Sequence, residues 1–155
     1  LSSAASDVYK RQVFKSDEYT IYTRLIEGKY FAYQKMFTEG EINTCASRTA
    51  LIGAMTRAKM CTEEKQPAVF QIEDDVLNIS IRDKLADYQE QVPLQETVCK
   101  SIRLGFDSRL VLETLKAFTC DNIALGFTSP RTPMIVEAED SDMKAMVLPV
   151  AIREA

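Results

Sequence analysis

The sequence predicts an α+β fold built from one unit that occurs twice: a strand, then a helix, then three further strands. Short runs rich in β-branched or alternating apolar residues predict the strands, and two stretches with apolar residues three and four positions apart predict the helices. The same order of elements occupies residues 41–94 and again residues 98–150. Short links between strands favour antiparallel pairing, so we expect two antiparallel sheets with both helices side by side on one face.

The first copy opens with a strand at residues 41–45. Ser47 can cap the following helix, because a serine hydroxyl accepts a hydrogen bond from a free backbone N–H of the first turn. The helix should run to about Cys61 and bury a face formed by Leu51, Ala54, Met55 and Ala58. Strands are expected next at residues 68–73, 76–82 and 87–94. The acidic pair at residues 74–75 predicts a turn between the first two of these strands.

The second copy opens with a strand at residues 98–106, and Asp107 can cap a helix from Ser108 to about Phe118. The buried stripe of this helix should consist of Val111, Leu112, Leu115 and Phe118. Three more strands are expected at residues 121–127, 133–138 and 144–150. Upstream of both copies, residues 18–28 predict another strand, and residues 29–37 predict an aromatic connector.

The composition excludes several classes of function. The chain of 155 residues has a net charge of −4, so nucleic-acid binding through overall positive charge is not expected, although a locally basic face is compatible with it. The absence of histidine rules out Ser-His-Asp and Cys-His catalytic groups and histidine-dependent zinc sites. The glycine motifs that cradle nucleotide phosphates are also missing. We therefore expect no enzyme, no metal site and no cofactor.

Cysteine usage and the two ends of the chain give further expectations. Four cysteines form no CxxC pair, which indicates buried thiols in a reducing cytoplasm, and no apolar run approaches the ~20 residues that span a bilayer. Residues 1–12, LSSAASDVYKRQ, resemble a translated sequencing adapter. We expect them to be a non-native leader or, alternatively, a disordered native tail, on a fragment that lacks its N-terminal part.

The predicted helices carry a concentration of positive charge. The first helix has three basic residues and no acidic one, and the second has two basic residues on a face shared with Glu113. Taken alone, this pattern favours an ordinary solvated surface, and the alternative is a face directed at a phosphate backbone. Met60 and Cys61 end the first helix beyond its buried stripe, so they belong either to the core or to a contact between protomers.

The chain closes on an apolar run, residues 145–152, that Pro149 interrupts. Proline has no backbone N–H, so Pro149 should end the hydrogen-bond ladder of the last strand. Met146, Leu148 and Val150 alternate with Val147 and would share one face of a regular strand. Such a face is either ordinary core or, if uncovered, a docking surface.

Motifs in a fixed order resemble the C-terminal part of the bacterial DNA polymerase III β sliding clamp family. Residues 24–37, RLIEGKYFAYQKMF, resemble the link between the second and third domains of the family, with Phe31 where proline is usual. Residues 104–118, 129–140 and 146–152 supply the remaining motifs, LGFDSRLVLETLKAF, SPRTPMIVEAED and MVLPVAI. The resemblance covers about residues 18 to 152.

This resemblance implies a DNA-clamp fold, in which helices line the inside of a ring and sheets form its outside. Residues 13–37 would be the end of clamp domain two and the linker, and residues 38–155 would be clamp domain three. Two protomers would close around double-stranded DNA as a homodimer, which reconciles an acidic chain with basic helices. The implied function is that of a processivity factor, which tethers DNA polymerase III and the clamp loader through short motifs bound in a hydrophobic pocket.

The resemblance also assigns residues to three surfaces. The DNA-facing residues would be Arg48, Arg57, Lys59, Arg109 and Lys116. The partner-peptide pocket would comprise Phe31, Lys35, Met36, Thr132, Pro133, Met146, Leu148, Pro149, Val150 and Ala151. The contact between protomers would involve Met60 and Cys61, with Asp87 and Glu90 beside them. The alternative function is a stand-alone two-sheet domain that binds a ligand or catalyses a reaction, and a third is a clamp-like scaffold of a phage or mobile element.

Overall fold

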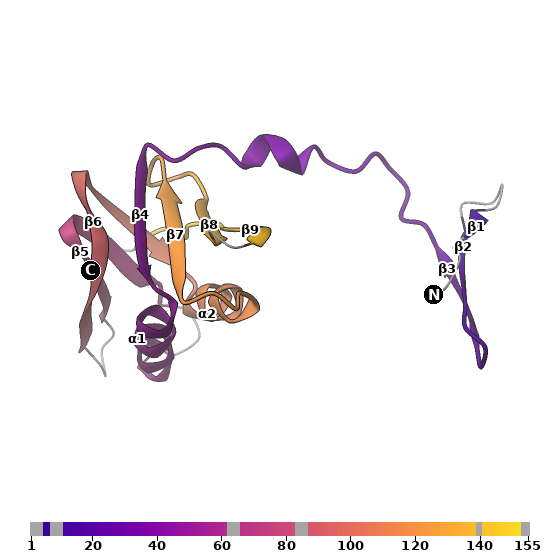
Figure 1. The fold of residues 1–155 in the computed structure, drawn as a ribbon, viewed down its shortest axis with the longest axis horizontal. Helices are drawn as coiled ribbons and strands as arrows, with labels where there is room; N and C mark the ends of the chain where they lie inside the picture. The colour runs from indigo at the N-terminus through magenta and orange to yellow at the C-terminus, as the bar shows by residue number, and fades with distance from the viewer. Residues whose placement is uncertain (1–4, 7–10, 62–65, 83–86, 139–140, 153–155) are drawn as a thin grey trace. The chain divides into compact units, whose positions relative to one another are not determined.

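The computed structural model describes residues 5–6, 11–61, 66–82, 87–138 and 141–152. The chain divides into two compact units, Leu1–Tyr33 and Gln34–Ala155 (Figure 1). No helix among the described residues is long and apolar enough to cross a membrane.

The first unit is a small antiparallel sheet in the order β1–β2–β3. It consists of β1 (Ala5–Ser6), β2 (Arg11–Lys15) and β3 (Thr20–Arg24). A tight turn joins β2 to β3, in which the Ser16 backbone N–H donates to the Tyr19 carbonyl over 2.9 Å. The strand predicted at residues 18–28 is present as the shorter β3. Parts of the predicted leader lie in β1 and β2, while residues 1–4 and 7–10 are outside the described residues, so the non-native leader stays a prediction.

In its described residues the second unit holds two helices and a six-stranded antiparallel sheet in the order β5–β6–β4–β7–β8–β9. The strands are β4 (Ile42–Ser47), β5 (Ala68–Arg82), β6 (Asp87–Phe106), β7 (Asn122–Phe127), β8 (Met134–Ala138) and β9 (Ser141–Val147). The helices are α1 (Arg48–Met60) and α2 (Ser108–Ala117), and a 3-10 turn, η1 (Tyr33–Met36), precedes β4. The predicted α+β class is confirmed, since the described residues form two helices and two antiparallel sheets. The two repeated units, however, share one six-stranded sheet, and the other sheet lies in the first unit.

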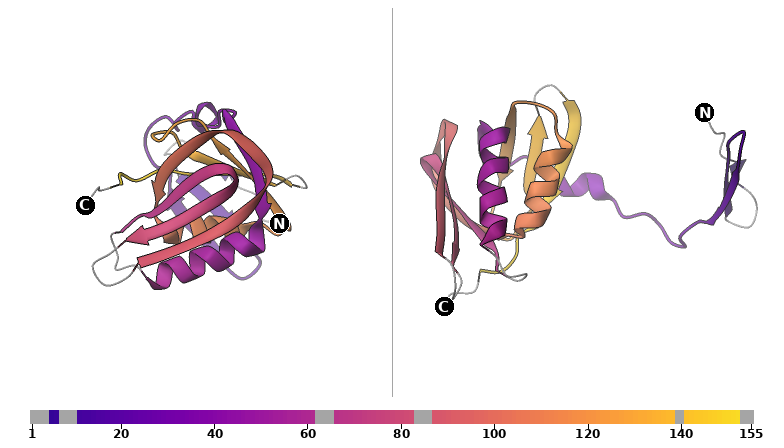
Figure 2. Two further views of the ribbon diagram at one scale, coloured as in Figure 1. Left: turned by 90° about the vertical axis from the view of Figure 1, so that its left-hand side faces the viewer. Right: turned by 90° about the horizontal axis from the view of Figure 1, so that it is seen from below.

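The two helices form as the sequence predicts. Ser47 caps α1 by accepting a hydrogen bond from the Ala50 N–H over 3.4 Å, and Asp107 caps α2 by accepting one from the Arg109 N–H over 2.8 Å. The predicted faces of both helices are buried. Figure 2 shows the helices side by side against the concave side of the sheet.

The predicted turn at residues 74–75 is wrong, because the chain passes through it as the single strand β5. Asp74 has a positive φ of 51°, and the register with β6 shifts on both sides of it, which makes this site a bulge. Phe70 and Ile72 are buried before the bulge and Leu77 and Ile79 after it. Before the bulge the even-numbered residues of β5 face the core, and after it the odd-numbered residues do. The extra residue in the bulge thus keeps the apolar side chains of both halves on the core side of the sheet.

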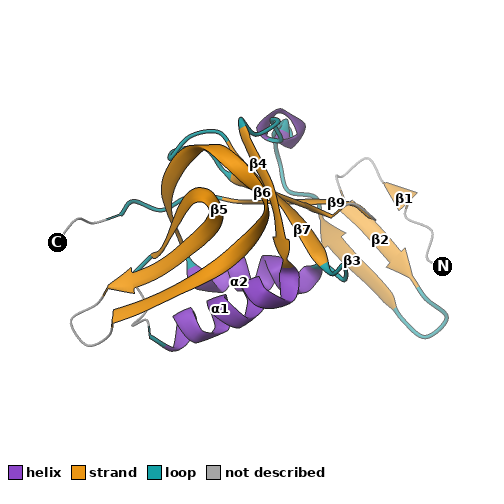
Figure 3. Ribbon diagram, turned by 60° about the vertical axis from the view of Figure 1, so that its left-hand side comes forward, coloured by secondary structure: helices purple, strands orange, loops and turns teal. Residues whose placement is uncertain are grey.

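The strands predicted at residues 87–94 and 98–106 are likewise one element, the 20-residue β6. It pairs with β5 along most of its length and meets β4 at the pair Ala46–Leu94. β5 and β6 thus form a long bent ribbon that Figure 3 shows wrapping over the helices. Phe70 of β5 and Phe106 of β6 pack edge to face in the core, with ring centroids 5.2 Å apart.

Chain geometry shows that the six-stranded sheet curls strongly. Three strands separate β9 from β6 in the sheet order, so a flat sheet would hold them ~19 Å apart. Val147 ends β9, and three residues later the Val150 backbone N–H donates to the Gly105 carbonyl of β6 over 2.8 Å. Three residues reach at most ~11 Å. The sheet must therefore bend around the core and bring its last strand towards β6.

Candidate functional site

The end of β9 exposes apolar side chains, in agreement with the sequence. Leu148 is 59% exposed and Val150 41% exposed, whereas Val147 between Met146 and Leu148 is buried. The strand predicted at residues 144–150 is shifted, because β9 begins at Ser141 and ends at Val147. The ladder stops before Pro149, and the chain then leaves β8 and turns to β6.

The loop before β8 lies beside this exposed segment. Met134 of β8 pairs with Val147 of β9, so Pro133, just before β8, and Leu148, just after β9, are the next two residues opposite each other. A compact turn fixes the approach to Pro133, because the Thr132 hydroxyl donates to the Ser129 carbonyl over 3.0 Å and accepts from the Ser129 N–H over 2.9 Å. The structure therefore brings Thr132 and Pro133 together with the end of β9.

The remaining predicted pocket residues lie outside β8 and β9. Lys35 and Met36 lie in η1, where both are exposed, and Ala151 is exposed after Val150. Phe31 belongs to the first unit, where its ring stacks on Tyr30 at a centroid distance of 5.1 Å. Its membership of the pocket stays a prediction.

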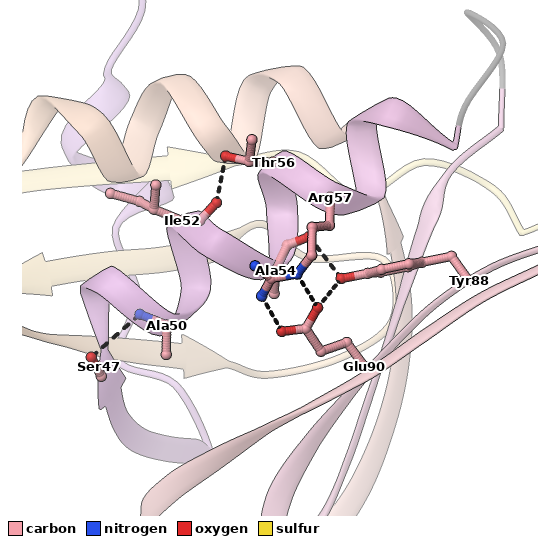
Figure 4. Close-up of polar contacts among 8 residues, drawn as sticks. All are labelled: Ser47, Ala50, Ile52, Ala54, Thr56, Arg57, Tyr88 and Glu90. Atoms are coloured by element: carbon pink, nitrogen blue, oxygen red, sulfur yellow. Dashed lines mark hydrogen bonds and ion pairs between the residues drawn. The ribbon is translucent and has the colours of Figure 1, made fainter.

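A hydrogen-bonded cluster links the middle of α1 to the start of β6 (Figure 4). The Arg57 guanidinium forms a two-pronged ion pair with the Glu90 carboxylate, one contact being 2.8 Å from Nε to Oε2. The Tyr88 hydroxyl lies within hydrogen-bond distance of the same carboxylate and of the Ala54 carbonyl, 2.8 Å away, and its one proton can be donated to either. Side chains thereby tie a helix to a strand that lies far along the sequence.

The cluster changes the proton affinity of its members. The hydrogen bond from Arg57 holds the pKa of Glu90 below its ordinary value. Burial of the Tyr88 hydroxyl raises the pKa of that phenol, and the hydrogen bond with Glu90 raises it further. Both shifts preserve the observed pairing at neutral pH, with an ionised carboxylate and a protonated phenol.

This pair joins two surfaces that were expected to be separate. Arg57 was expected to face DNA and Glu90 to face another protomer, yet the two side chains bind each other. The Arg57 side chain is 56% exposed, so it still borders solvent, but a carboxylate compensates its charge. Tyr88 was not among the predicted site residues, and its only signal in the sequence is its place two residues before Glu90 on one face of a strand.

The other basic residues of the helices differ in how they are held. The Arg48 Nε–H donates to the Cys120 carbonyl over 2.6 Å, so this side chain ties the start of α1 to the segment after α2. Arg109 lies 3.7 Å from the carboxylate of Asp107 and is exposed, as are Lys59 and Lys116. The exposed cations thus lie on both helices.

The predicted contact between protomers lies where α1 ends. Met60 is 82% exposed, and Cys61 is half-buried at the helix end, where its N–H donates to the Ala58 carbonyl over 3.0 Å. Asp87 is exposed at the first position of β6. Residues 87–93 pair with β5 along one edge, and no described strand pairs with their other edge.

A polar groove lies over the face of β5 and β6 that points away from the core. Amide side chains line it, and Gln91 donates to Asn78 across the two strands over 2.9 Å. Ile152 also lines the groove. The described residues contain no group of three potential metal ligands.

Comparison with known proteins identifies relatives of the chain. The family profile for the C-terminal domain of the DNA polymerase III beta subunit matches residues 37–151. The beta sliding clamp of Staphylococcus aureus is 24% identical over 143 residues, which cover 89% of this chain and 38% of the relative. The beta sliding clamp of Halalkalibacterium halodurans is 24% identical over 135 residues, covering 84% and 36%. The chain thus spans well under half the length of these relatives.

Solved structures share the fold. The polymerase III beta subunit of Thermotoga maritima superimposes with a TM-score of 0.85 at 15% identity, over 98% of this chain and 42% of that one. The sliding clamp of Caulobacter crescentus gives a TM-score of 0.85 at 13% identity, over 94% and 40%. At these identities the likeness shows the fold alone.

Proposed function

The chain belongs to the family of C-terminal domains of the DNA polymerase III beta subunit, and from this premise we propose that it is part of a DNA sliding clamp. The observation that carries the proposal is the extent of the match, which spans both helices and all six strands of the second unit. A clamp does no chemistry: it raises the local concentration of a polymerase at its template by topology. The family match favours this function over a stand-alone ligand-binding or enzymatic domain.

Double-stranded DNA is the first proposed partner, in the bacterial cytoplasm where replication takes place. Lys59 on α1 and Arg109 and Lys116 on α2 are exposed cations that can approach phosphates. Arg57 contributes less, because Glu90 compensates its charge, and Arg48 is engaged with the Cys120 carbonyl. Few and weak phosphate contacts suit a ring that must slide.

The second proposed partner is a short linear motif in DNA polymerase III or the clamp loader. Leu148 presents apolar area beside Pro133, Val150 is exposed two residues further on, and the sequence assigns Met146 and Met36 to the same surface. An exposed apolar surface of this kind is typical of a peptide-docking site. Methionine side chains suit varied ligands because they repack easily.

The third proposed partner is a second copy of the full-length chain. Met60 offers an exposed apolar side chain three residues beyond Arg57, which binds Glu90 in the segment 87–93. Burial of Met60 and Cys61 together would contribute on the order of 2 to 5 kcal/mol to association. An uncovered strand edge adds unpaired backbone groups that another strand can satisfy.

A processivity assay tests the proposed function. The full-length protein, its clamp loader and its polymerase are given a long primed template and an excess of unlabelled competitor template. We expect long products from single binding events, because the ring prevents the polymerase from leaving. Products of the same length with and without the protein would contradict the proposal.

A further inference from the structure

We propose that the segment from Leu148 to Ile152, here called the C-terminal strap, is held at both ends, and that Gly105 and Ile152 are positioning residues for the peptide surface. The inference rests on the proposed function, because it concerns how the peptide-docking surface is kept in shape. Figure 3 shows the chain leaving β9 and running towards β5 and β6.

The first end of the strap is fixed by β9. Val147 is the last residue of the strand, pairs with Met134 of β8 and is only 3% exposed. Its side chain belongs to the main apolar core. The backbone just before Leu148 is therefore held in place by the core packing of Val147.

The second end is fixed by β6. The Val150 N–H donates to the Gly105 carbonyl over 2.8 Å, which makes an antiparallel bridge. Gly105 also pairs with Val69 of β5, so the strap occupies the opposite edge of β6 at this point. Two residues further on, Ile152 is half-buried and lies over Gly105 beside Pro67.

Only Leu148 and Pro149 lie between the two ends. The ring of Pro149 fixes its φ angle, and two anchored neighbours leave the pair little freedom. Leu148 is therefore held outward, at 59% exposure, instead of folding back onto the core. A ligand that docks on a surface already in its bound shape loses less binding free energy to ordering.

Gly105 is needed because the strap crosses it so closely. A Cβ at this position would lie 2.8 Å from the Val150 carbonyl oxygen, 3.0 Å from Ile152 Cγ1 and 3.2 Å from Pro67 Cβ. The nearest of these atoms is backbone, which cannot swing away as the end of a flexible side chain can. An alanine at position 105 would push the strap off β6 and free Leu148 to move.

Gly126 of β7 provides a matched control. It is also a strand glycine, but a Cβ there would meet the side-chain Oδ1 of Asn43 at 3.2 Å and Ile135 Cβ at 3.6 Å, away from the strap. Gly126→Ala therefore reproduces the general effect of replacing a strand glycine. Any difference between the two variants reports on the strap.

The experiment compares wild type, Gly105→Ala, Gly126→Ala, Ile152→Ala and Leu148→Ala in the full-length protein. Binding of a fluorescein-labelled peptide that carries glutamine, leucine and phenylalanine is measured by anisotropy, and hydrogen exchange reports on the Val150 amide and on the core strands. For Gly105→Ala we expect roughly tenfold weaker peptide binding, as for a lost anchor contact. Its Val150 amide should exchange faster, while the core strands stay protected as in Gly126→Ala.

The outcomes separate the strap from the function on which it rests. A folded Gly105→Ala variant that binds the peptide within about twofold of Gly126→Ala, while Leu148→Ala binds weakly, overturns the strap and leaves the docking surface intact. If Gly105→Ala does not fold, Ile152→Ala provides the test, because it only shortens one half-buried side chain. An Ile152→Ala variant that binds the peptide with unchanged affinity overturns the inference. A wild-type protein that binds no such peptide overturns the docking surface itself.

Discussion

At the scale of single residues, the ion pair between Arg57 and Glu90, with Tyr88 beside it, determines whether the Arg57 charge is available to bind DNA. The Arg57 guanidinium lies on a helix expected to face DNA, yet its nearest partner is a carboxylate of the same chain. Tyr88 adds a hydrogen bond to the carbonyl of Ala54, so the cluster grips the helix backbone as well as a side chain. We therefore assign Arg57 mainly to holding α1 against β6.

This assignment predicts a pH-dependent contribution of Glu90 to stability. Arg57 lowers the pKa of Glu90 in the folded protein below 4.5, the ordinary pKa of a glutamate carboxyl. The contribution of Glu90 to the free energy of unfolding is therefore complete above pH 4.5 and is lost as the pH falls through the lower pKa of the folded protein. Glu90→Gln should speed hydrogen exchange of α1 amides at pH 7, and the difference from wild type should shrink at pH 3.

The control for this measurement is Glu41→Gln, which removes the exposed ion pair with Lys100. Exposed pairs contribute little to stability, so this variant should leave exchange in α1 unchanged. Equal exchange in wild type and Glu90→Gln at pH 7 would show that the cluster does not hold the helix.

A second residue-scale prediction concerns Met146, a half-buried side chain of the proposed docking surface. Met146→Ala should weaken binding of the fluorescent peptide by about 1 to 3 kcal/mol, the usual loss for an anchor contact. Met143→Ala is the matched control, because it removes an exposed methionine nearer the start of the same strand. If both variants lose the same amount of affinity, Met146 is not an anchor.

At the scale of elements, α1 and α2 lie side by side and carry the exposed cations. Arg57 is paired with Glu90, so we expect Lys59, Arg109 and Lys116, whose side chains are exposed, to contribute more to any contact with phosphates. Charge at these positions acts on phosphates through solvent and is screened by salt. We therefore expect any attraction between these helices and DNA to weaken as the ionic strength rises.

We expect the double variant Arg109→Glu and Lys116→Glu to slow loading of the full-length protein onto primed DNA, most strongly at low salt. The control is Lys144→Glu on β9, which reverses an exposed charge paired with Glu137. Loading rates that are equal for the helix and strand variants at low salt would remove α2 from the DNA-facing surface.

The elements also show what sequence patterns can predict. Caps at Ser47 and Asp107 and the buried faces of both helices were predictable, because they depend on neighbouring residues. The bulge at Asp74 was not predictable, because an acidic pair is compatible with a turn as well as with a bulge. Only the pairing of this segment with β6 distinguishes the bulge from a turn. The exposed end of β9 was predictable, whereas the pairing of Arg57 with Glu90 depends on a contact across 33 residues.

At the scale of the whole molecule, the chain supplies a domain with an exposed apolar helix end and an uncovered strand edge close together. A ring closed by such a surface should open when the apolar part is removed. Met60→Ala combined with Cys61→Ala should weaken self-association by about 2 to 5 kcal/mol. Sedimentation of the full-length protein at low micromolar concentration measures the change.

Leu110→Ala is the control for this variant, since it removes an apolar side chain of α2 that is 51% exposed. It should sediment like wild type. A double variant at Met60 and Cys61 that remains as associated as the control would place the contact between protomers elsewhere.

The central claim is that the full-length protein holds DNA by encircling it. The direct measurement loads labelled protein onto a circular plasmid with its clamp loader, isolates the complex at high salt, and cuts the plasmid once with a restriction enzyme. High salt weakens phosphate contacts but not a topological link. We predict that the protein stays on the intact circle and leaves soon after the cut. Equal retention on circular and linear DNA, or loss from both in high salt, would contradict the account.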